Sequence, residues 1–219
     1  MRHVSAVAFD LDDTLTDWSA AIDGALSEIT DPATAERFRA AVREHAWLRR
    51  DGAVVSRRHW MTLNNPDLFW SAALDRDGAE AAEMAERYRA ALEWSLFDDV
   101  LPTLDALAPY VRLALLSNAP RALERAERVG VLDRFEVALS APRDRMKPHP
   151  DAFDALLDAL HLPAAEVAYV GDDAEEDVEG ALAHGMLSIH LDRHRSGWRP
   201  PAGVITIHSL TELPHALGL

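Results

Sequence analysis

Short apolar runs alternate with amphipathic helical patterns along most of the chain, and this alternation restricts the fold more than any other feature. Strand-like runs occur at residues 4–10, 111–117, 135–140, 167–171, 187–191 and 204–207, and helical patterns at 101–109, 121–130, 150–160, 178–184 and 210–217. Nearly continuous apolar strands that alternate with helices are typical of a parallel sheet covered on both faces. The sequence therefore predicts an α/β protein with a Rossmann-like, three-layer α/β/α core around a central parallel sheet.

The alternation is interrupted between about residues 16 and 96, where we find no convincing strand. Apolar residues recur there at helical spacing among good helix formers, as in "ATAERFRAAVREHAWL". Five of the six tryptophans also lie in this region: Trp18, Trp47, Trp60, Trp70 and Trp94. We predict an all-α helical-bundle domain of residues 16–97, inserted into a core domain made of residues 1–15 and 98–219.

The composition excludes several classes of partner and chemistry. Asp and Glu total 37 against 22 for Lys and Arg, a formal net charge of −15, and so acidic a surface repels nucleic-acid backbones and anionic bilayers. The chain has no cysteine, which excludes disulfides and thiolate catalysis. It has neither an apolar run of the roughly 18 residues that suggest a membrane span nor a signal-like leader, so we expect a cytoplasmic protein.

Acidic and polar side chains gather where the predicted strands end. Asp10 and Asp12 follow the first strand, Ser117 and Asn118 the second, and Asp172 the fourth. In open parallel sheets, ligands bind beyond these carboxyl ends. Alternate residues of an extended segment point the same way, so Asp10 and Asp12 can face one site. Crowded carboxylates repel one another, and a hard divalent cation such as Mg²⁺, which prefers oxygen ligands, relieves that repulsion.

Four short motifs carry a resemblance to a known family. In chain order they are "FDLDDTL", "LLSNA", "RMKPHPDAF" and "YVGDDAEEDVEGA". As an ordered set at strand ends, they resemble the motifs of the haloacid dehalogenase superfamily, specifically its aspartate-nucleophile phosphatases. The helical insertion after the first motif is similar to the family's α-helical C1-type cap, which closes over the leaving group and excludes water.

The resemblance implies the roles of the four residues closest to the reaction. Asp10 is the expected nucleophile, which forms an aspartyl-phosphate. Asp12 is expected to protonate the leaving oxygen and later to deprotonate the attacking water. The resemblance places Mg²⁺ on Asp10, on the backbone carbonyl of Asp12 and on Asp172. Lys147 is expected to neutralise the remaining phosphate charge.

The resemblance also implies a set of supporting residues. Ser117 is expected to donate a hydrogen bond to a phosphate oxygen, with Asn118 beside it in the substrate site. Asp177 is expected to orient Lys147 or a metal-bound water, and Asp173 is an auxiliary acid. Trp18, just after the first motif, is a candidate for contact with substrate.

Several of these residues also have a purely structural interpretation. Ser117 and Asn118 could cap the helix that follows them, a position that both residue types favour. Asp172 and Asp173 could likewise cap a helix whose acidic first turn suits the helix dipole. Lys147 could be a solvated lysine in front of a proline-rich turn.

A predicted loop of the insertion, "RRDGAVVSRRHW", offers further candidates for substrate contact. Its side chains could meet a second anionic group or stack on a base. The alternative is that the arginines are solvated or paired and that the tryptophan belongs to the core of the insertion. The candidates are Arg49, Arg50, Arg57, Arg58, His59 and Trp60.

The resemblance implies a phosphoric monoester hydrolase that acts on a small phosphorylated metabolite, such as a sugar phosphate, phosphoglycolate or a nucleoside monophosphate. A phosphomutase with the same motifs is the alternative, although such mutases often have glycine where this chain has Asp13. Dehalogenases of the superfamily lack the second acid, because halide leaves without a proton, so Asp12 disfavours dehalogenation. A non-catalytic binding protein is a further alternative, but such relatives usually lack the nucleophile, the second acid or the lysine, and this chain has all three. We expect a monomer or a homodimer.

Overall fold

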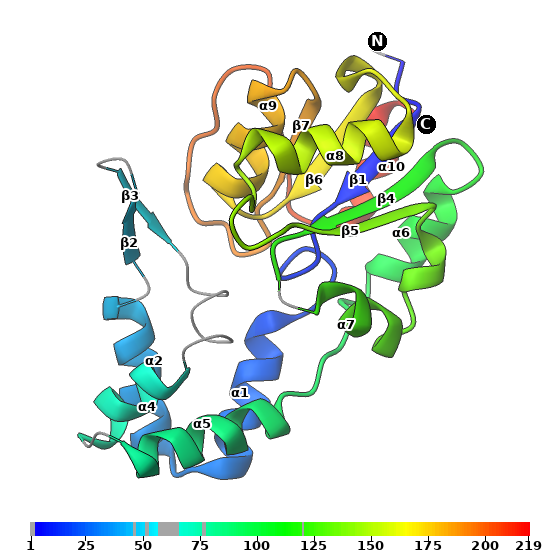
Figure 1. Cartoon of the computed structure of the whole chain (residues 1–219). Coiled ribbons are helices and arrows are strands. Elements are labelled where there is room, and N and C mark those ends of the chain that lie inside the picture. The colour runs from blue at the N-terminus through cyan, green and yellow to red at the C-terminus, as the bar shows by residue number, and fades with distance from the viewer. Residues whose placement is uncertain (1–2, 46, 51–52, 57–65, 76–77, 120) are drawn as a thin grey trace. The chain divides into compact units, whose positions relative to one another are not determined.

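The computed structural model describes residues 3–45, 47–50, 53–56, 66–75, 78–119 and 121–219 (Figure 1). The chain forms two compact units, each with its own internal packing. The larger unit contains Met1–Asp17 and Leu96–Leu219, and the smaller unit contains Trp18–Ser95.

The larger unit is built on a parallel six-stranded sheet in the order β5-β4-β1-β6-β7-β8. Every neighbouring pair in this sheet is parallel. The predicted strands are confirmed, with ends that shift by no more than a few residues. Their bounds are β1 Ala6–Phe9, β4 Arg112–Ser117, β5 Val137–Ser140, β6 Val167–Gly171, β7 Leu187–Leu191 and β8 Ile205–Ile207.

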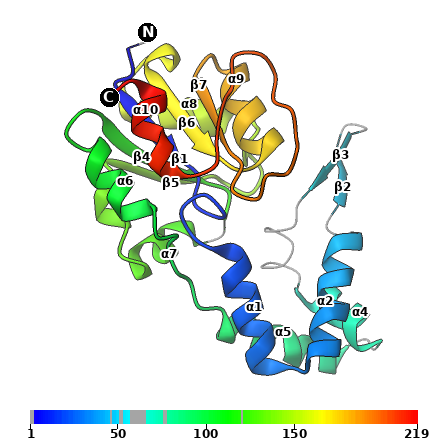
Figure 2. The same cartoon turned by 180° about the vertical axis from the view of Figure 1, so that it is seen from behind.

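Helices cover both faces of the sheet, which confirms the predicted α/β/α layers. One layer contains α8 (Pro150–Leu160) and α9 (Gly180–Ala183), which lie in front of the sheet in Figure 1. The opposite layer contains α6 (Val100–Leu107) and α10 (Leu213–Leu217), in front in Figure 2, together with α7 (Ala122–Arg128). Short helical turns η1 (Leu132–Arg134), η2 (Ala164–Glu166) and η4 (Leu210–Glu212) complete the connections.

The central strand β1 divides its side chains between the two cores. Val7 and Phe9 pack with α6, α7 and α10, whereas Ala6 and Ala8 pack with α8 and α9. Successive side chains of a strand point to opposite faces, and all four are fully buried. This two-sided burial explains why the strand is apolar throughout rather than alternating in polarity.

The helix predicted at residues 178–184 begins earlier than the apolar pattern indicates. A π-helical segment, η3 (Ala174–Glu179), runs directly into α9. Its first turn is acidic, and Asp173 caps it by accepting hydrogen bonds from the backbone N–H groups of Glu175 (2.9 Å) and Glu176 (2.8 Å). Capping side chains extend a helix beyond its apolar stripe, which hydrophobic periodicity cannot reveal.

The smaller unit is mainly helical and has an aromatic core of its own. Its helices are α1 (Trp18–Ile29), α2 (Pro32–His45), α4 (Pro66–Leu74) and α5 (Ala79–Ala91). The ring of Phe38 lies 4.6 Å from that of Trp70 and 5.2 Å from that of Tyr88, measured between ring centroids. Aromatic pairs at such distances contribute beyond their buried area, so Trp70 helps to stabilise this core.

The expectation that the insertion has no strand is wrong for one segment. Trp47–Arg50 (β2) and Ala53–Ser56 (β3) form an antiparallel pair where a loop between helices was expected. The run Ala53-Val54-Val55-Ser56 contains β-branched residues that favour strands, but it is too short to stand out beside long helical patterns. Arg49 and Arg50 lie in β2, whereas Arg57, Arg58, His59 and Trp60 lie outside the described residues.

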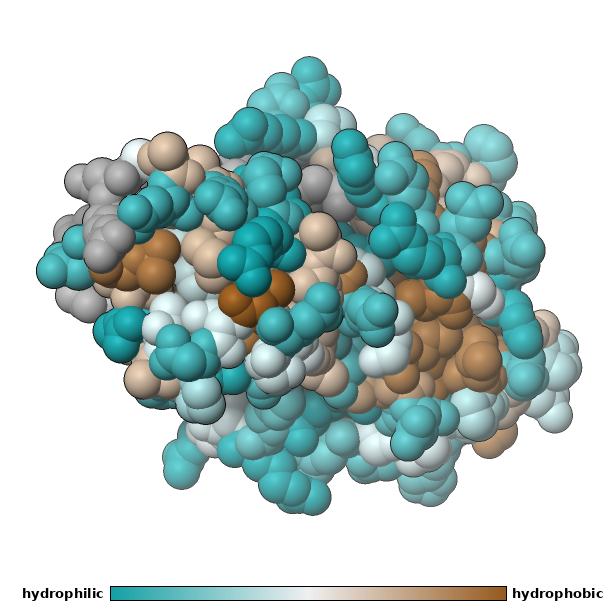
Figure 3. All heavy atoms as spheres, turned by 90° about the horizontal axis from the view of Figure 1, so that it is seen from below, coloured by the Kyte–Doolittle hydropathy of each residue, from teal (hydrophilic) through white to brown (hydrophobic). Residues whose placement is uncertain are grey.

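The surface is mainly hydrophilic on the face that Figure 3 shows. Hydrophilic side chains cover most of the face seen in Figure 3, with apolar areas between them. Across the described residues, no helix is both long enough and apolar enough to cross a membrane.

Gly180 provides a test of the packing between α8 and α9. A Cβ atom at this position would lie 2.7 Å from ring atoms of Phe153 and 3.3 Å from the Cβ of Pro148. We expect Gly180→Ala to lower the free energy of unfolding by about 1–3 kcal/mol, the usual cost of overpacking a core. Urea denaturation of the two proteins measures this difference.

Gly24→Ala is the matched control for this substitution. Gly24 lies within α1, and a Cβ atom there would have nothing within 4 Å. Alanine is the better helix former, so we expect a gain of about 0.5–1 kcal/mol. A Gly180→Ala protein as stable as the wild type would contradict the close approach of the two helices.

Candidate active site

Three neighbouring strands bring polar side chains to one edge of the sheet. β4, β1 and β6 lie side by side; Ser117 ends β4, Asp10 follows β1 and Asp172 follows β6. The backbone N–H of Asp10 donates to the carbonyl oxygen of Val170 at 2.9 Å, so Asp10 remains in register with β6. Neighbouring strands are about 4.8 Å apart, so the parallel topology alone gathers these residues.

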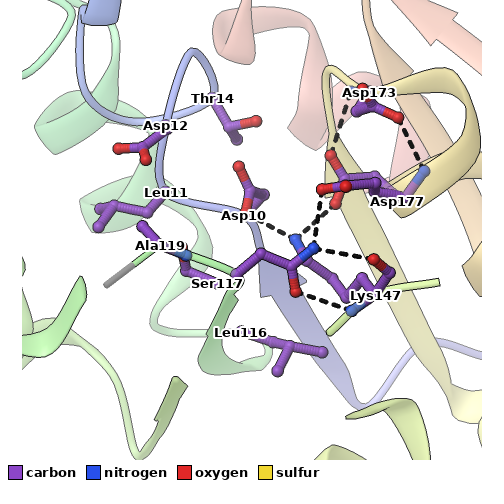
Figure 4. Close-up of polar contacts among 12 residues, drawn as sticks. Asp10, Leu11, Asp12, Thr14, Leu116, Ser117, Ala119, Lys147, Asp173 and Asp177 are labelled. Atoms are coloured by element: carbon purple, nitrogen blue, oxygen red, sulfur yellow. Dashed lines mark hydrogen bonds and ion pairs between the residues drawn. The ribbon is translucent and has the colours of Figure 1, made fainter. Parts of the chain in front are cut away.

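The side-chain ammonium of Lys147 is the centre of a buried polar cluster (Figure 4). Its Nζ donates to Asp10 Oδ1 at 2.6 Å, to Asp177 Oδ1 at 2.6 Å and to the Tyr169 hydroxyl at 2.8 Å. Only 1% of the Lys147 side chain is exposed. An ammonium group has three donors, and these contacts use all of them, so the charge is held in one position. The alternative of a solvated lysine is thereby excluded.

The hydroxyl of Tyr169 connects Lys147 to the sheet. Burial raises the pKa of Tyr169 well above its ordinary value, so the hydroxyl stays protonated. It donates to the carbonyl oxygen of Leu116 at 2.9 Å and accepts from Lys147. The position of the ammonium group therefore depends on β6 and β4 as well as on its two carboxylate partners.

Burial changes the acidity of the candidate nucleophile. The pKa of Asp10 is raised to about 7. Removal from water is the largest cause, the Lys147 charge opposes it, and the charges of Asp177 and Asp12 add to it. Burial alone would lower the pKa of Lys147, but the charges of Asp10 and Asp177 raise it well above its ordinary value. The lysine therefore stays protonated, and the cluster has more negative charge than one ammonium group neutralises. Additional positive charge would favour the ionised form of Asp10.

Asn118 holds the loop that carries Lys147. The backbone N–H of Lys147 donates to Asn118 Oδ1 at 2.7 Å, and Asn118 Nδ2 donates back to the Lys147 carbonyl oxygen at 2.9 Å. The same Nδ2 lies 2.7 Å from Glu176 Oε2. The Asn118 amide is thus occupied by the backbone of Lys147, which supports a structural role; direct contact of Asn118 with substrate stays a prediction.

The fourth motif contributes one residue to the cluster and one to a helix cap. Asp177 accepts from Lys147 through Oδ1, and its Oδ2 accepts from the backbone N–H of Asp173 at 3.1 Å. Asp173 caps η3, as described above, which favours its structural interpretation over that of an auxiliary acid. Gly171 makes room for Asp177, because a Cβ atom on Gly171 would lie 2.3 Å from the Asp177 Cγ.

The carboxylates of Asp10, Asp172 and Asp177 fit a divalent cation. Each offers one oxygen, and the three oxygens lie within 4.8 Å of one another. Carboxylate oxygens suit Mg²⁺, and the raised pKa of Asp10 indicates that the cluster favours added positive charge. Asp172 also accepts from the Thr14 hydroxyl at 3.3 Å. Asp177 was not among the expected ligands, but it supplies an oxygen to the same region.

Asp12 points away from the cluster, in the direction opposite to Lys147 (Figure 4). Its Oδ1 forms a buried ion pair with the guanidinium of Arg125. The Thr16 hydroxyl lies 3.1 Å from the same oxygen and 3.2 Å from the Leu11 carbonyl oxygen. Leu11, between the two acids, is fully buried in the hydrophobic core. Asp10 and Asp12 therefore have separate partners, and the Asp12 carboxylate does not join the cluster around Lys147.

Ser117 and Trp18 occupy different environments. Ser117 is buried, and its Oγ accepts from the backbone N–H of Ala119 at 3.1 Å, which leaves the hydroxyl proton available as a donor. Trp18 belongs to the smaller unit, where it is buried and its ring centroid lies 5.1 Å from that of Trp94. This packing favours a structural role for Trp18 over the expected contact with substrate.

Sequence reasoning missed Tyr169 and Arg125. Both are polar residues within apolar patterns, which is the signal that could have found them. Tyr169 lies in the apolar run Val167–Gly171, and Arg125 shares the inward face of α7 with Ala122 and Ala126. A polar group in such a place needs a buried partner, but only the folded chain identifies which one.

Comparison with known proteins gives a family and several curated relatives, among them a phosphatase and a dehalogenase. A family model described as haloacid dehalogenase-like hydrolase matches residues 4–185. The chain is 31% identical over 201 residues to 5-amino-6-(5-phospho-D-ribitylamino)uracil phosphatase YigB of Escherichia coli (strain K12), covering 85% of this chain and 82% of that protein. It is 29% identical over 200 residues to the (S)-2-haloacid dehalogenase of Xanthobacter autotrophicus, covering 87% and 76%.

The fold also matches a solved structure. The HAD-hydrolase YfnB from Bacillus subtilis has a TM-score of 0.77 with 18% sequence identity. The match covers 99% of this chain and 100% of that chain. At this level of identity the likeness concerns the fold alone.

The buried position of Lys147 leads to a stability prediction. Lys147→Met leaves two carboxylates buried without their counterion, and breaking a buried pair in this way typically costs about 3–5 kcal/mol. We expect a loss of this size in urea denaturation at neutral pH, in buffer containing a chelator. Arg145→Met, which removes an exposed partner of Asp151, is the control and should change stability little.

The loss of stability in Lys147→Met should also depend on pH, and it should increase as the pH rises. In the wild type, Asp10 has a pKa near 7, above the value of about 3.9 for an exposed aspartate. Its contribution to stability is therefore lost as pH rises from about 4 through 7. Without the Lys147 charge this pKa rises further, so the deficit of the variant should be larger at pH 9 than at pH 6. A deficit that is equal at both values would contradict the pairing of Lys147 with Asp10.

Proposed function

The chain belongs to the haloacid dehalogenase-like hydrolase family, whose model matches residues 4–185, and from this premise we propose that it is a Mg²⁺-dependent phosphatase. Its reaction is the hydrolysis of a small phosphorylated metabolite through an aspartyl-phosphate on Asp10. The observation that carries the proposal is the buried cluster in which the Asp10 carboxylate lies 2.6 Å from the fixed ammonium group of Lys147. The 31% identity to a phosphatase supports the same chemistry.

Asp10 is the nucleophile of the proposed reaction. Its carboxylate oxygen bonds to phosphorus while the bond from phosphorus to the leaving oxygen breaks, and water later hydrolyses the aspartyl-phosphate. Lys147 holds the carboxylate in position and places a positive charge beside the phosphate oxygens, where negative charge accumulates. Asp177 and Tyr169 fix that charge in advance, so it needs no reorganisation during the reaction.

Asp12 is the general acid and base. It donates a proton to the leaving oxygen in the first step and accepts one from the attacking water in the second. This role separates the two kinds of relative found above. A halide leaves without a proton, so a dehalogenase needs no such acid, whereas an alkoxide leaving group does. The presence of Asp12 two residues after Asp10 therefore favours the phosphatase over the dehalogenase.

Mg²⁺ is the proposed cofactor. When bound, it supplies positive charge that reduces the repulsion between the nucleophilic carboxylate and the phosphate oxygens. Asp10 and Asp172 are its proposed side-chain ligands, with the backbone carbonyl of Asp12 as a further ligand. Asp177 offers an oxygen to the same region, but its principal partner is Lys147.

The remaining site residues bind the phosphate or support those that do. Ser117 donates its hydroxyl proton to a phosphate oxygen. Asn118 acts indirectly, because its amide fixes the backbone of Lys147 on both sides. Sugar phosphates, phosphoglycolate and nucleoside monophosphates are the proposed substrate classes. Release of inorganic phosphate, rather than isomerisation of the substrate, distinguishes this activity from that of a phosphomutase.

Replacement of the nucleophile tests the proposed reaction. Asp10→Asn keeps the shape of the side chain and removes its nucleophilic charge, so phosphate release should fall by at least about 10³-fold. The assay uses 4-nitrophenyl phosphate and a panel of sugar phosphates, phosphoglycolate and nucleoside monophosphates in Mg²⁺.

Asp144→Asn is the control, because Asp144 is an exposed aspartate whose ion-pair partner is Arg145 and not a residue of the cluster. It should keep wild-type activity. Full activity of Asp10→Asn would refute the mechanism, and chloride release from 2-chloropropionate without phosphate release would identify a dehalogenase instead.

Replacement of Asp172 tests the cation. Asp172→Asn removes one carboxylate ligand, so the Mg²⁺ concentration that gives half-maximal activity should rise at least about tenfold. Asp173→Asn is the adjacent control: asparagine caps helices as well as aspartate does, so its Mg²⁺ dependence should match the wild type. Equal Mg²⁺ dependence of the Asp172 variant and the wild type, or full wild-type activity in chelator, would overturn the metal assignment.

A further inference from the structure

Arg125 lies where a helix of this kind normally places an apolar side chain. It is on α7, between Ala122 and Ala126, both fully buried, and only 6% of its side chain is exposed. Arg121 and Arg128, on the same segment, are exposed. The chain therefore places one charged arginine inward and leaves the other two in solvent, although burying a charge is costly.

The buried arginine has a specific partner. The Arg125 guanidinium pairs with Asp12 Oδ1, and 8% of the Asp12 side chain is exposed. Thr16, four residues after Asp12, lies 3.1 Å from the same oxygen. These contacts come from α7 and from the segment after β1, so the carboxylate is held by two separate parts of the larger unit.

Stability alone does not account for a buried pair of this kind. Replacing a buried ion pair by apolar residues of similar volume is often neutral or stabilising, and α7 already offers alanines on both sides. An arginine does what an apolar residue cannot: its planar fork of donors fixes the orientation of a carboxylate. It also stays protonated in proteins, so Arg125 cannot replace Asp12 as the proton donor.

We propose that Arg125 is a positioning residue that holds the Asp12 carboxylate in the orientation from which it transfers a proton to the leaving oxygen. This inference rests on the proposed phosphatase function and adds a residue to it. Arg125 acts through Asp12 and does not contact the substrate. Replacing Arg125 should therefore reduce the rate most for substrates whose leaving group needs a proton.

The test compares two leaving groups. 4-Nitrophenolate leaves readily without a proton, whereas the alkoxide of an alkyl phosphate does not. The alkyl substrate is whichever of glucose 6-phosphate, 2-phosphoglycolate and uridine 5′-monophosphate the wild type hydrolyses fastest. We expect Arg125→Met to lower kcat/KM for that substrate by about 10²-fold or more, the lower end of what general acid catalysis contributes. For 4-nitrophenyl phosphate the loss should be only a few-fold.

Three further variants separate positioning from folding. Arg125→Lys keeps the charge and should restore part of the alkyl-phosphate activity. Arg128→Met, exposed on the same helix, should behave as the wild type with both substrates. Asp12→Asn combined with Arg125→Met leaves no unpaired buried charge, so it folds even where the single variant does not. It should lose no more activity than Asp12→Asn alone, because residues that act through one another are not additive.

Two results would overturn the inference. Equal losses of kcat/KM with both substrates would show that Arg125 contributes to the stability of the fold and not to proton transfer. Additive losses of activity in the double variant would show that Arg125 does not act through Asp12. A wild-type protein without phosphate release from any of these substrates would instead remove the proposed function, and the inference with it. The wild-type assay is therefore carried out first and distinguishes the two failures.

Discussion

The pairing of one buried ammonium group with two buried carboxylates is the interaction on which the site depends. Lys147 lies between Asp10 and Asp177, 2.6 Å from each, and a charge so far from water persists only when its partners are fixed. The fold fixes these partners through more than one contact. Tyr169 completes the set of acceptors, and Gly171 leaves the space that Asp177 occupies. A site built this way is preorganised, which is the most effective form of electrostatic catalysis.

A second buried ion pair keeps the two acids of the first motif distinct. Asp10 is paired with Lys147, which comes from the loop before α8, and Asp12 is paired with Arg125, which comes from α7. Two adjacent carboxylates with the same surroundings would share one chemical character. The two cationic side chains come from segments on opposite faces of the sheet, so each carboxylate has its own orientation. Separate roles for a nucleophile and a proton donor require such a difference.

The architecture explains how distant segments supply one site. In a parallel sheet every strand ends at the same edge, so Asp10, Ser117 and Asp172 meet there because β1, β4 and β6 are neighbours. The smaller unit contributes a separate aromatic core around Phe38 and Trp70.

The sequence by itself determined the strands, the layered α/β class and most of the charged cluster, because apolar periodicity and motifs at strand ends are local properties. It did not determine that Asn118 binds the Lys147 backbone, that Asp173 caps a helix, or that residues 47–50 and 53–56 form an antiparallel strand pair. It also did not reveal Tyr169 and Arg125. Partner choice among buried polar groups is a long-range property: Arg125 and Asp12 are 113 residues apart. Only the folded chain, in which α7 lies beside the segment that follows β1, brings them together.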